Sequence, residues 1–417
     1  MAKCETLEAP HSGKMTGRVT ILTSGPLCRN PRVLKEAGTL GSAGLDVTVV
    51  TIARSERFEQ VDEQILRGAP FRKCAVDRLG RTGISRLKSF LERGLTAAAR
   101  RARWQHPTAL GPHLALRNAA LERPFDLLIA HTELPLCIAA DFMTHGMSVA
   151  ADLEDWHSRD LLPAMQAARP LPLLRRTEAM ILRGARHVTT TSGPLADALA
   201  DTYQARRPAV VPNAFPLSAS PSFTPPSRQP SFVWISQTVG PGRGLEQFIA
   251  AWSRMKTEAN CFLRGEVDPH YRKALVTSAP ERVRANLHFQ PIVPPDEIPV
   301  VLRQHDIGLA LEPREPANKD LTISNKVFHY LDAGLALVAT PTRGQRAVFN
   351  ADPAIGLIDD LSSPESLAGR LDLLAGRQDT LNAARAAARR LAEREFSWEK
   401  AAPLLLEIVQ RSLARKK

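Results

Sequence analysis

Ionisable side chains cluster in one short run of this sequence. Residues 151–160 read ADLEDWHSRD and directly follow an apolar, β-branched segment. Charged groups so close together at the end of an expected strand are hard to explain by packing, because charged side chains are seldom buried without a partner or a function. We interpret four of them as candidate catalytic groups, with a solvated helix start as the alternative: Asp152, Glu154, Asp155 and His157.

A glycine-rich segment precedes a predicted helix near residue 245. Gly240, Gly242 and Gly244 allow close approach of the backbone to a diphosphate, and the free amides of a helix N-terminus favour an anion. Arg243 adds a guanidinium that suits two-point phosphate binding. The segment has no Gly-Lys-Ser or Gly-Lys-Thr of a Walker loop, and a glycine turn before a helix is common, so by itself the motif is weak.

A lysine stands in the first turn of another predicted helix, within SNKVFHYLDAGLALVAT, residues 324–340. Ser324 and Asn325 are of the residue types that cap helices. Lys326 has no such explanation, since a cation at a helix N-terminus is unfavourable unless an anion lies there. The segment therefore predicts an anion site.

The segment after the first expected strand carries a similar signal. In residues 24–38, Asn30 can cap a helix whose first turn contains Pro31 and Arg32. This pattern is consistent with a second anion site, and equally with an ordinary turn and a solvated arginine.

Short β-branched runs alternate with helical stretches from about residue 18, the pattern of parallel sheets covered by helices. We therefore predict an α/β protein with two doubly wound domains. The expected strands lie at 18–24, 46–52, 125–131, 147–152, 187–192 and 209–213, and then at 231–236, 260–265, 287–292, 306–312, 335–340 and 355–359.

The proline-rich segment 216–230 has no hydrophobic periodicity, so we read it as a linker. We expect a loose segment over 1–15, one Rossmann-like domain over 16–215, a second over 231–395, and a terminal helix over 396–417 that crosses back to the first domain. Open parallel sheets bind ligands at the carboxyl ends of their strands, and so the loops after the strands should hold the site.

Composition sets further limits. The 417 residues, 44% hydrophobic and 24% charged, exclude a small stapled scaffold and global disorder. The five cysteines are scattered, without the spacing of a zinc site, and favour a reducing compartment. No run has the pattern of a signal peptide or a membrane span, so we expect a cytoplasmic protein.

The net charge of +12 is concentrated locally, with eight basic residues and one acid between positions 78 and 103. A helix predicted over about 84–103 has an apolar seam of Ile84, Leu87, Leu91, Leu95 and Ala98. We interpret it either as a helix that lies on the anionic inner face of a membrane, which would make the protein peripheral there, or as a covering helix packed on the sheet. Nucleic acid is disfavoured, because the chain is only 5% aromatic and offers no stacking platform.

Together these segments resemble the retaining nucleotide-sugar glycosyltransferases of family 4, which have the GT-B fold. The resemblance extends over roughly residues 18–415, and its loose individual motifs occur in the family's order. They are NPRVLKEA with GLDVTVV, GARHVTTTSGPLADAL, VVPNAF, GPGRGLEQFIAAW, SNKVFHYLDAGLALVAT and FSWEKAAPLL.

The resemblance implies roles for particular residues. On the donor side, Arg243 would contact the diphosphate, together with Gly240, Gly242, Ser324, Asn325 and Lys326. Thr238 stands where the family often has an arginine, and His329 where it usually has a ribose-binding glutamate. The acceptor side would include Asn30, Arg32, His131 and Glu133. Asp152, Glu154 and Asp155 align with a common Asp-x-His-Glu run, so the histidine is replaced by Glu154 or displaced to His157.

The implied function is transfer of a sugar from a nucleotide-sugar donor to a glycan or lipid-linked acceptor, with retention, in cell-surface polysaccharide or glycolipid biosynthesis. The family is thought to need neither metal nor other cofactor. Two alternatives stay open. One is a catalytically weak relative that binds a nucleotide-sugar or acts as a scaffold, which Thr238, His329 and Glu154 favour; the other is a nucleotide-sugar epimerase of the same fold.

Overall fold

The structure is a computed structural model that describes residues 15–80, 82–166, 169–218 and 229–414. The chain forms two compact units. The first contains the described residues of Met1–Ala151 and Leu405–Lys417 together with Gly184–His187, and the second those of Asp152–Arg183 and Val188–Leu404. Most of the expected loose segment and of the expected linker lies outside the described residues.

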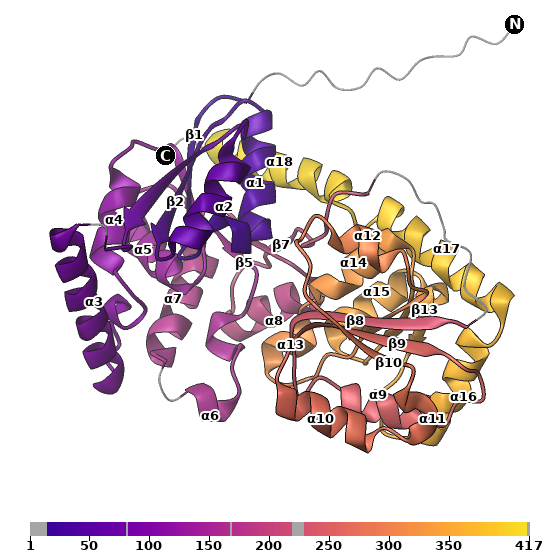
Figure 1. The fold of residues 1–417 in the computed structure, drawn as a ribbon. Helices are drawn as coiled ribbons and strands as arrows, with labels where there is room; N and C mark the ends of the chain where they lie inside the picture. The colour runs from indigo at the N-terminus through magenta and orange to yellow at the C-terminus, as the bar shows by residue number, and fades with distance from the viewer. Residues whose placement is uncertain (1–14, 81, 167–168, 219–228, 415–417) are drawn as a thin grey trace, which may run out of the picture. The chain divides into compact units, whose positions relative to one another are not determined.

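The first sheet has seven strands in the order β3-β2-β1-β4-β5-β6-β7. Figure 1 labels β1, β2, β5 and β7 of this sheet. β1 pairs in parallel with both β2 and β4, so the direction in which the sheet grows changes between β1 and β4. The strands are β1 (Arg18–Leu22), β2 (Asp46–Ala53), β3 (Arg72–Asp77), β4 (Leu127–His131), β5 (Val149–Leu153), β6 (Val188–Thr190) and β7 (Ala209–Val210).

Burial explains the composition of these strands. In β2 every residue after Asp46 is buried, as expected for a strand covered by helices on both faces. Helices of this half of the chain are α1 (Pro31–Ser42), α2 (Glu56–Leu66), α3 (Gly83–Arg101), α4 (His113–Leu121), α5 (Glu133–Thr144), α6 (Pro163–Gln166), α7 (Leu171–Gly184) and α8 (Gly193–Tyr203).

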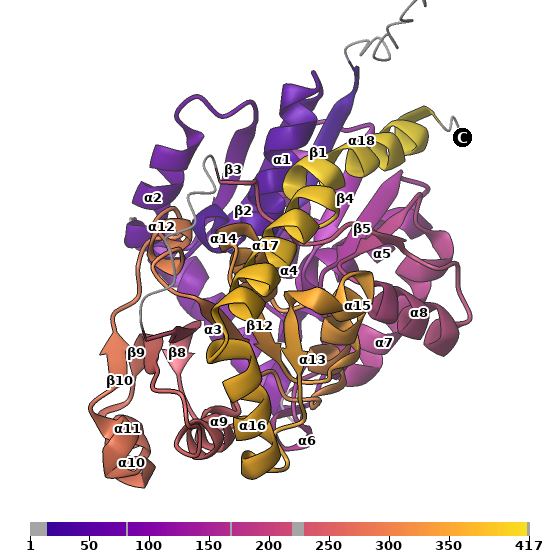
Figure 2. The ribbon, with the colours of Figure 1, turned by 90° about the vertical axis from the view of Figure 1, so that its right-hand side faces the viewer.

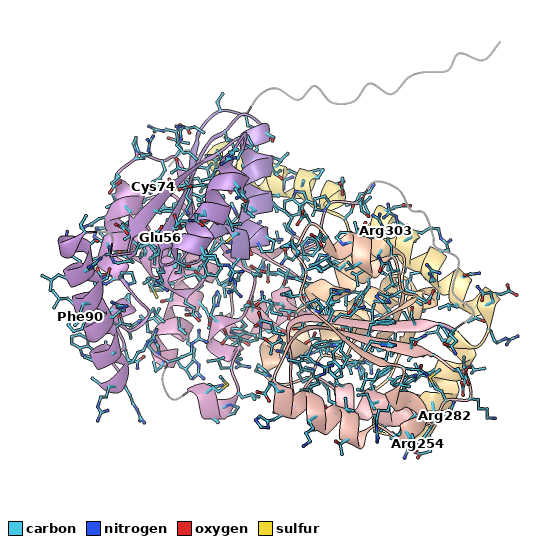
Figure 3. The ribbon with its side chains drawn as sticks, in the orientation of Figure 1. Glu56, Cys74, Phe90, Arg254, Arg282 and Arg303 are labelled. Carbon is cyan, nitrogen blue, oxygen red and sulfur yellow. The ribbon has the colours of Figure 1, made fainter. Side chains whose placement is uncertain are left out.

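Helix α3 turns its apolar seam toward solvent. Leu87, Leu91 and Leu95 are each more than half exposed, and Phe90, labelled in Figure 3, is 68% exposed. The expectation of a covering helix whose leucines pack on the sheet is therefore wrong.

The second sheet is parallel throughout, in the order β10-β9-β8-β11-β12-β13. Figure 2 labels β8, β9, β10 and β12 of this sheet. Its strands are β8 (Ser231–Val239), β9 (Asn260–Val267), β10 (Leu287–Gln290), β11 (Ile307–Ala310), β12 (Ala336–Ala339) and β13 (Gly356–Ile358). Alternate residues of β8 enter different cores: Phe232 and Trp234 belong to one, Val233 and Ile235 to the other. This alternation puts a core on each face of the sheet.

The helices of the second half are α9 (Leu245–Trp252), α10 (Pro269–Ser278), α11 (Glu281–Arg284), α12 (Ile298–Leu302), α13 (Ala317–Leu321), α14 (Asn325–Ala333), α15 (Arg343–Ala351), α16 (Pro364–Ala375), α17 (Gln378–Arg394) and α18 (Trp398–Ala414). The described helices include none that is both long and apolar enough to cross a membrane.

The α/β prediction of two doubly wound parallel sheets is confirmed, and every expected run contains a strand. β3 was missed. The terminal helix also behaves as expected, because α18 belongs to the first unit from Leu405 onward. Within that unit, the hydroxyl of Ser412 lies 2.7 Å from Nδ1 of His187.

Candidate active site

The centre of the second sheet brings two loops together. β8 and β11 are neighbours, yet β9 lies on the far side of β8 and β12 on the far side of β11. The loops after β8 and β11 therefore start side by side at the carboxyl edge of the sheet, and the chain continues from them in opposite directions along the sheet. Doubly wound sheets bind their ligands at such a point. A Cβ atom on Gly244 would lie 3.0 Å from Cβ of Leu311, so the loop after β8 packs closely on the segment after β11.

Two of the three glycines in this loop are required by the backbone. Gly242 has a φ of +71° and Gly244 one of +72°, a region that residues with a Cβ rarely adopt. Gly240 does not have a positive φ of this kind, and a Cβ added to it would meet no other atom within 4 Å. Thr238 does not lie in the loop at all, since it is an exposed residue of β8 that pairs with Glu266.

Arg243 lies between the two required glycines, directly before α9. Its side chain is partly exposed. It makes no ion pair with any residue in the described ranges. That this guanidinium binds an anion at the N-terminus of the helix stays a prediction.

Lys326 has an anionic partner within the chain. Its ammonium group pairs with the carboxylate of Glu312, which follows β11, and lies 5.3 Å from the ring centroid of Trp234 on β8. Burial by itself would raise the pKa of Glu312, but Lys326 and the nearby Lys319 outweigh it and lower that pKa to about 2. The carboxylate is therefore charged at neutral pH.

This pair changes the argument made from the sequence. The anion that a lysine at a helix N-terminus requires is Glu312, so the position of Lys326 alone does not demand a phosphate. Ser324 occupies the N-cap position of α14 but makes no capping bond; its hydroxyl donates to Oε1 of Glu312 at 3.0 Å instead. Glu312 was missed, although an acid at the end of an expected strand was a signal for it.

Asparagines hold two of the candidate catalytic carboxylates. Nδ2 of Asn213 donates to Oε1 of Glu154 at 2.8 Å, and Nδ2 of Asn318 donates to Oδ1 of Asp155 at 2.6 Å. Oδ1 of Asn318 also accepts from the backbone N–H of Trp156 at 2.8 Å. Both asparagines are buried, and the sequence did not single them out as site residues.

The other two members of that run are buried. Asp152 lies on β5 and is 1% exposed, and His157 begins a short 3₁₀ turn that ends at Arg159. A solvated helix start does not describe this segment. Ser158 of the same turn donates twice to the buried Glu178, from its N–H at 2.9 Å and from its hydroxyl at 2.7 Å, which fixes the turn.

Asn213 joins the acidic run to the lysine-bearing helix. Besides Glu154, its amide donates to Oδ1 of Asn325 at 3.2 Å, and Asn325 is the residue before Lys326. His329, one turn further along α14, stacks on the ring of Phe215 with centroids 3.9 Å apart. This stacking gives His329 a packing role.

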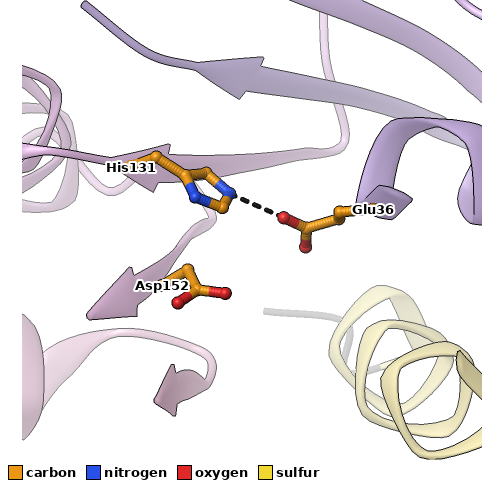
Figure 4. A group of neighbouring side chains, drawn as sticks. All are labelled: Glu36, His131 and Asp152. Carbon is orange, nitrogen blue, oxygen red and sulfur yellow. Dashed lines mark hydrogen bonds and ion pairs between the residues drawn. The ribbon is translucent and has the colours of Figure 1, made fainter. Parts of the chain in front are cut away.

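The first sheet has a similar arrangement at its own reversal, between β1 and β4. Asn30 after β1 caps α1 as predicted, its Oδ1 accepting from the N–H of Val33 at 3.1 Å. His131 ends β4, and its Nε2 lies 2.6 Å from Oε2 of Glu36, both side chains being buried (Figure 4). Glu133 begins α5 and is partly exposed.

A strained residue links the two loops of this reversal. Thr132 has a φ of +67°, which is unfavourable for a β-branched side chain, and its hydroxyl donates to that of Ser24 at 3.2 Å. Strain of this kind is typical of functional sites. Arg32 is 1% exposed, so the alternative of a solvated arginine in an ordinary turn does not describe it.

Comparison with known proteins is consistent with this geometry. Residues 243–407 match a family model described as glycosyl transferase-like. No curated protein sequence matches the chain.

Solved structures cover almost the whole chain. HepE from Anabaena in complex with UDP-glucose has 16% identity and a TM-score of 0.64, over 94% of this chain and 99% of that one. Sucrose-phosphate synthase from Thermosynechococcus elongatus has 14% identity and a TM-score of 0.67, over 95% and 99%. WaaG, a glycosyltransferase involved in lipopolysaccharide biosynthesis, has 14% identity and a TM-score of 0.60, over 94% and 99%. At these identities the likeness shows the fold, which is the two-domain GT-B architecture.

Proposed function

We propose that this protein is a glycosyltransferase that transfers a sugar, with retention, from a nucleotide-sugar donor to a glycan or lipid-linked acceptor in cell-surface polysaccharide or glycolipid synthesis. The observation that carries the proposal is the meeting of the Arg243 loop with the Glu312–Lys326 pair at the reversal of the second sheet. The glycosyl transferase-like match over this segment supports it, as do HepE, solved with UDP-glucose, and WaaG, involved in lipopolysaccharide biosynthesis.

The donor diphosphate would be held by protein groups without a metal ion. Arg243 and the free amides at the start of α9 supply a cation and hydrogen-bond donors. The ammonium group of Lys326 has three N–H donors. The pair with Glu312 uses one of them and orients the group, and the others stay available for phosphate oxygens. These charges stabilise the diphosphate as it departs, which is the main electrostatic demand of the reaction.

The acceptor hydroxyl would attack the anomeric carbon on the face from which the diphosphate leaves. The new carbon–oxygen bond forms as the bond to the diphosphate breaks, and the proton of the hydroxyl passes to a diphosphate oxygen. Glu154 and Asp155, held by Asn213 and Asn318, would orient the sugar and the acceptor hydroxyl.

Binding of nucleoside diphosphates to matched variants tests the donor site. Arg243→Ala and Lys326→Ala are each expected to weaken binding by about 1–3 kcal/mol, the usual contribution of a charge-assisted hydrogen bond. UDP, GDP and dTDP are first compared by thermal shift, and the best of them is then titrated calorimetrically. The control is Arg272→Ala, which removes a guanidinium of α10 that lies over Phe289. Unchanged affinity in both site variants rules the assignment out.

A catalytically weak nucleotide-sugar binder is the second candidate. Thr238 is a strand residue and His329 stacks on Phe215, so neither supplies the arginine or the glutamate that the family usually carries. Slow hydrolysis of the donor in the absence of acceptor separates the two, because an active transferase transfers some sugar to water and a binder does not.

We further propose that the exposed seam of α3 binds an anionic bilayer. Leu87, Phe90, Leu91 and Leu95 form an apolar stripe, and Arg86, Lys88 and Arg93 are exposed on the same helix. Apolar side chains flanked by cations suit the boundary between anionic headgroups and acyl chains.

Vesicle flotation tests this surface. The protein should float with vesicles of phosphatidylcholine and phosphatidylglycerol, in a salt-sensitive manner, and not with phosphatidylcholine alone. Phe90→Ser with Leu91→Ser should abolish flotation, as should glutamine at Arg86, Lys88 and Arg93. Leu373→Ser, at a leucine of α16 that is 60% exposed, is the control. Flotation that survives both sets of changes excludes α3 as the membrane surface.

A further inference from the structure

A cavity of about 490 Å³ lies within the second unit, beside the acidic run. One wall comes from the 3₁₀ turn after β5, the short α6 and the start of α7. The other comes from the segment between β11 and α14, with the start of α15. The charged lining consists of Arg159, Arg175, Arg314, Arg343, Glu315 and Asp320.

The lining has an excess of positive charge, because four guanidinium groups face two carboxylates. Asp320 is already engaged: it accepts from Nε of Arg343 at 2.7 Å and lies 3.5 Å from Nε of Arg314. Its side chain is 12% exposed, whereas those arginines are more than half exposed. One internal carboxylate thus orients two arginines without neutralising both.

The remaining two arginines have no carboxylate partner among the described residues. Arg159 lies 4.4 Å from the ring centroid of the buried Trp156, which holds the guanidinium in place through a cation–π contact. Arg175 is an exposed residue of α7 and makes no ion pair there. A guanidinium group is suited to two-point binding of phosphate or carboxylate oxygens.

Apolar groups complete the lining, among them Leu162, Pro163 and Pro316. The C–H faces of a sugar ring pack against such side chains, while a charged substituent reaches the arginines. The volume is of the size that small-ligand sites have.

A short path of contacts connects this cavity to the donor site proposed above. Ala317 of the lining precedes Asn318, whose amide holds Asp155. The adjacent Glu154 accepts from Asn213, which in turn donates to Asn325 beside Lys326. A ligand in the cavity would therefore lie next to the carboxylates that we expect to orient the acceptor.

We propose that this cavity recognises an anionic acceptor, a saccharide that carries a phosphate or carboxylate group bound by Arg159 and Arg175. The inference rests on the proposed glycosyltransferase function and specifies its acceptor class. It also makes a claim that binding alone can test, without turnover.

Binding of simple probes is measured in the full chain saturated with the nucleoside diphosphate that binds best. Glucose 6-phosphate and glucuronate are each compared with glucose by ligand-observed NMR titration. Wild type should bind both anionic sugars at least ~10-fold more tightly than glucose, the factor expected for one charge-assisted hydrogen bond. In Arg159→Gln with Arg175→Gln that preference should disappear, while affinity for the nucleoside diphosphate stays unchanged.

The control variant has the same net charge as the cavity variant and loses the same kinds of contact. Arg272→Gln with Arg206→Gln removes one arginine that lies over an aromatic ring and one exposed arginine, both away from the cavity. This double variant should retain the preference for anionic sugars.

Three outcomes overturn the inference: no preference for anionic sugars in wild type, a preference that survives loss of both cavity arginines, or binding of glucose 6-phosphate only when the nucleoside diphosphate is left out, which would make the cavity part of the donor site. Failure of the proposed function looks different. In that case no nucleoside diphosphate binds and no donor sugar is released, whether or not the cavity binds anionic sugars.

Discussion

Lys326 is paired with an anion inside the protein and is also oriented for a ligand. Its position at the start of α14 requires an anion, and the buried Glu312 meets that requirement in the absence of ligand. Because the lysine is held against Trp234 as well, its charge is already oriented for the donor that we propose to bind there. Such preorganisation lowers the free-energy cost of ordering the site on binding.

Stability should depend on the charge of Glu312. Its pKa in the folded protein, about 2, lies below its ordinary value of 4.5, so its contribution is complete above pH 4.5 and is lost as the pH falls through 2. The difference corresponds to roughly 3 kcal/mol, of which about half is lost by pH 3. Urea unfolding of wild type and Glu312→Gln should thus show a gap that is largest at pH 7 and shrinks toward pH 3. A gap independent of pH contradicts this assignment.

The residues that the sequence did not reveal are those whose partners are distant along the chain. Asn318 and Asp155 are 163 positions apart, and Asn213 and Glu154 are 59 apart. Nothing local distinguishes a buried asparagine that orients a carboxylate from one in a turn. Arg243 was easier to single out as a candidate, since the glycines and the helix start that surround it are adjacent in sequence.

At the scale of elements, strands were predicted well because β-branched runs covered on both faces leave a strong signal. β3 was missed because Arg72–Asp77 mixes charged and small residues, and only Val76 is buried. α3 was predicted as a helix, but the exposure of its apolar seam was not. An amphipathic pattern does not say whether the apolar face of a helix meets protein or lipid.

The glycine loop provides a matched test of an element. Gly244→Ala forces a side chain into the left-handed region and brings its Cβ within 3.0 Å of Leu311 and Leu361, so it should cost about 1–3 kcal/mol of stability and weaken donor binding. Gly240→Ala should change stability by less than about 0.5 kcal/mol, because a built Cβ meets nothing within 4 Å. Urea unfolding and calorimetry measure both effects. Equal costs at the two positions would show that the loop adopts another conformation.

At the scale of the molecule, the chain does not divide into two consecutive domains. α18 begins in the second unit, where the N–H of Trp398 donates to the carbonyl of Phe215 at 3.0 Å, and it ends in the first. The sequence predicted this return from the helical pattern that follows an apparently complete second domain. The division of residues between the two units is a tertiary property, and it does not follow from local patterns.

Neighbouring leucines test how far the returning helix stabilises the first unit. Leu405 is 1% exposed and Leu404 is 39% exposed. Leu405→Ala should cost about 2–5 kcal/mol, since it leaves a cavity in the core, whereas Leu404→Ala should cost less than about 0.5 kcal/mol. Hydrogen exchange at the amides of β1 and β2 is the measurement. Equal protection in the two variants would mean that α18 contributes little to the first unit.

The returning helix also has a consequence for biosynthesis. A Cβ on Gly17 would lie 3.5 Å from the side chain of Leu413, so the start of β1 meets residues made almost four hundred positions later. Domains usually fold as units while translation proceeds, N-terminal ones first. Here the start of β1 leaves the ribosome long before the end of α18, which it meets in the folded unit, and contacts so distant in sequence slow folding. Newly made chains should therefore depend on chaperones that shield the first sheet during synthesis.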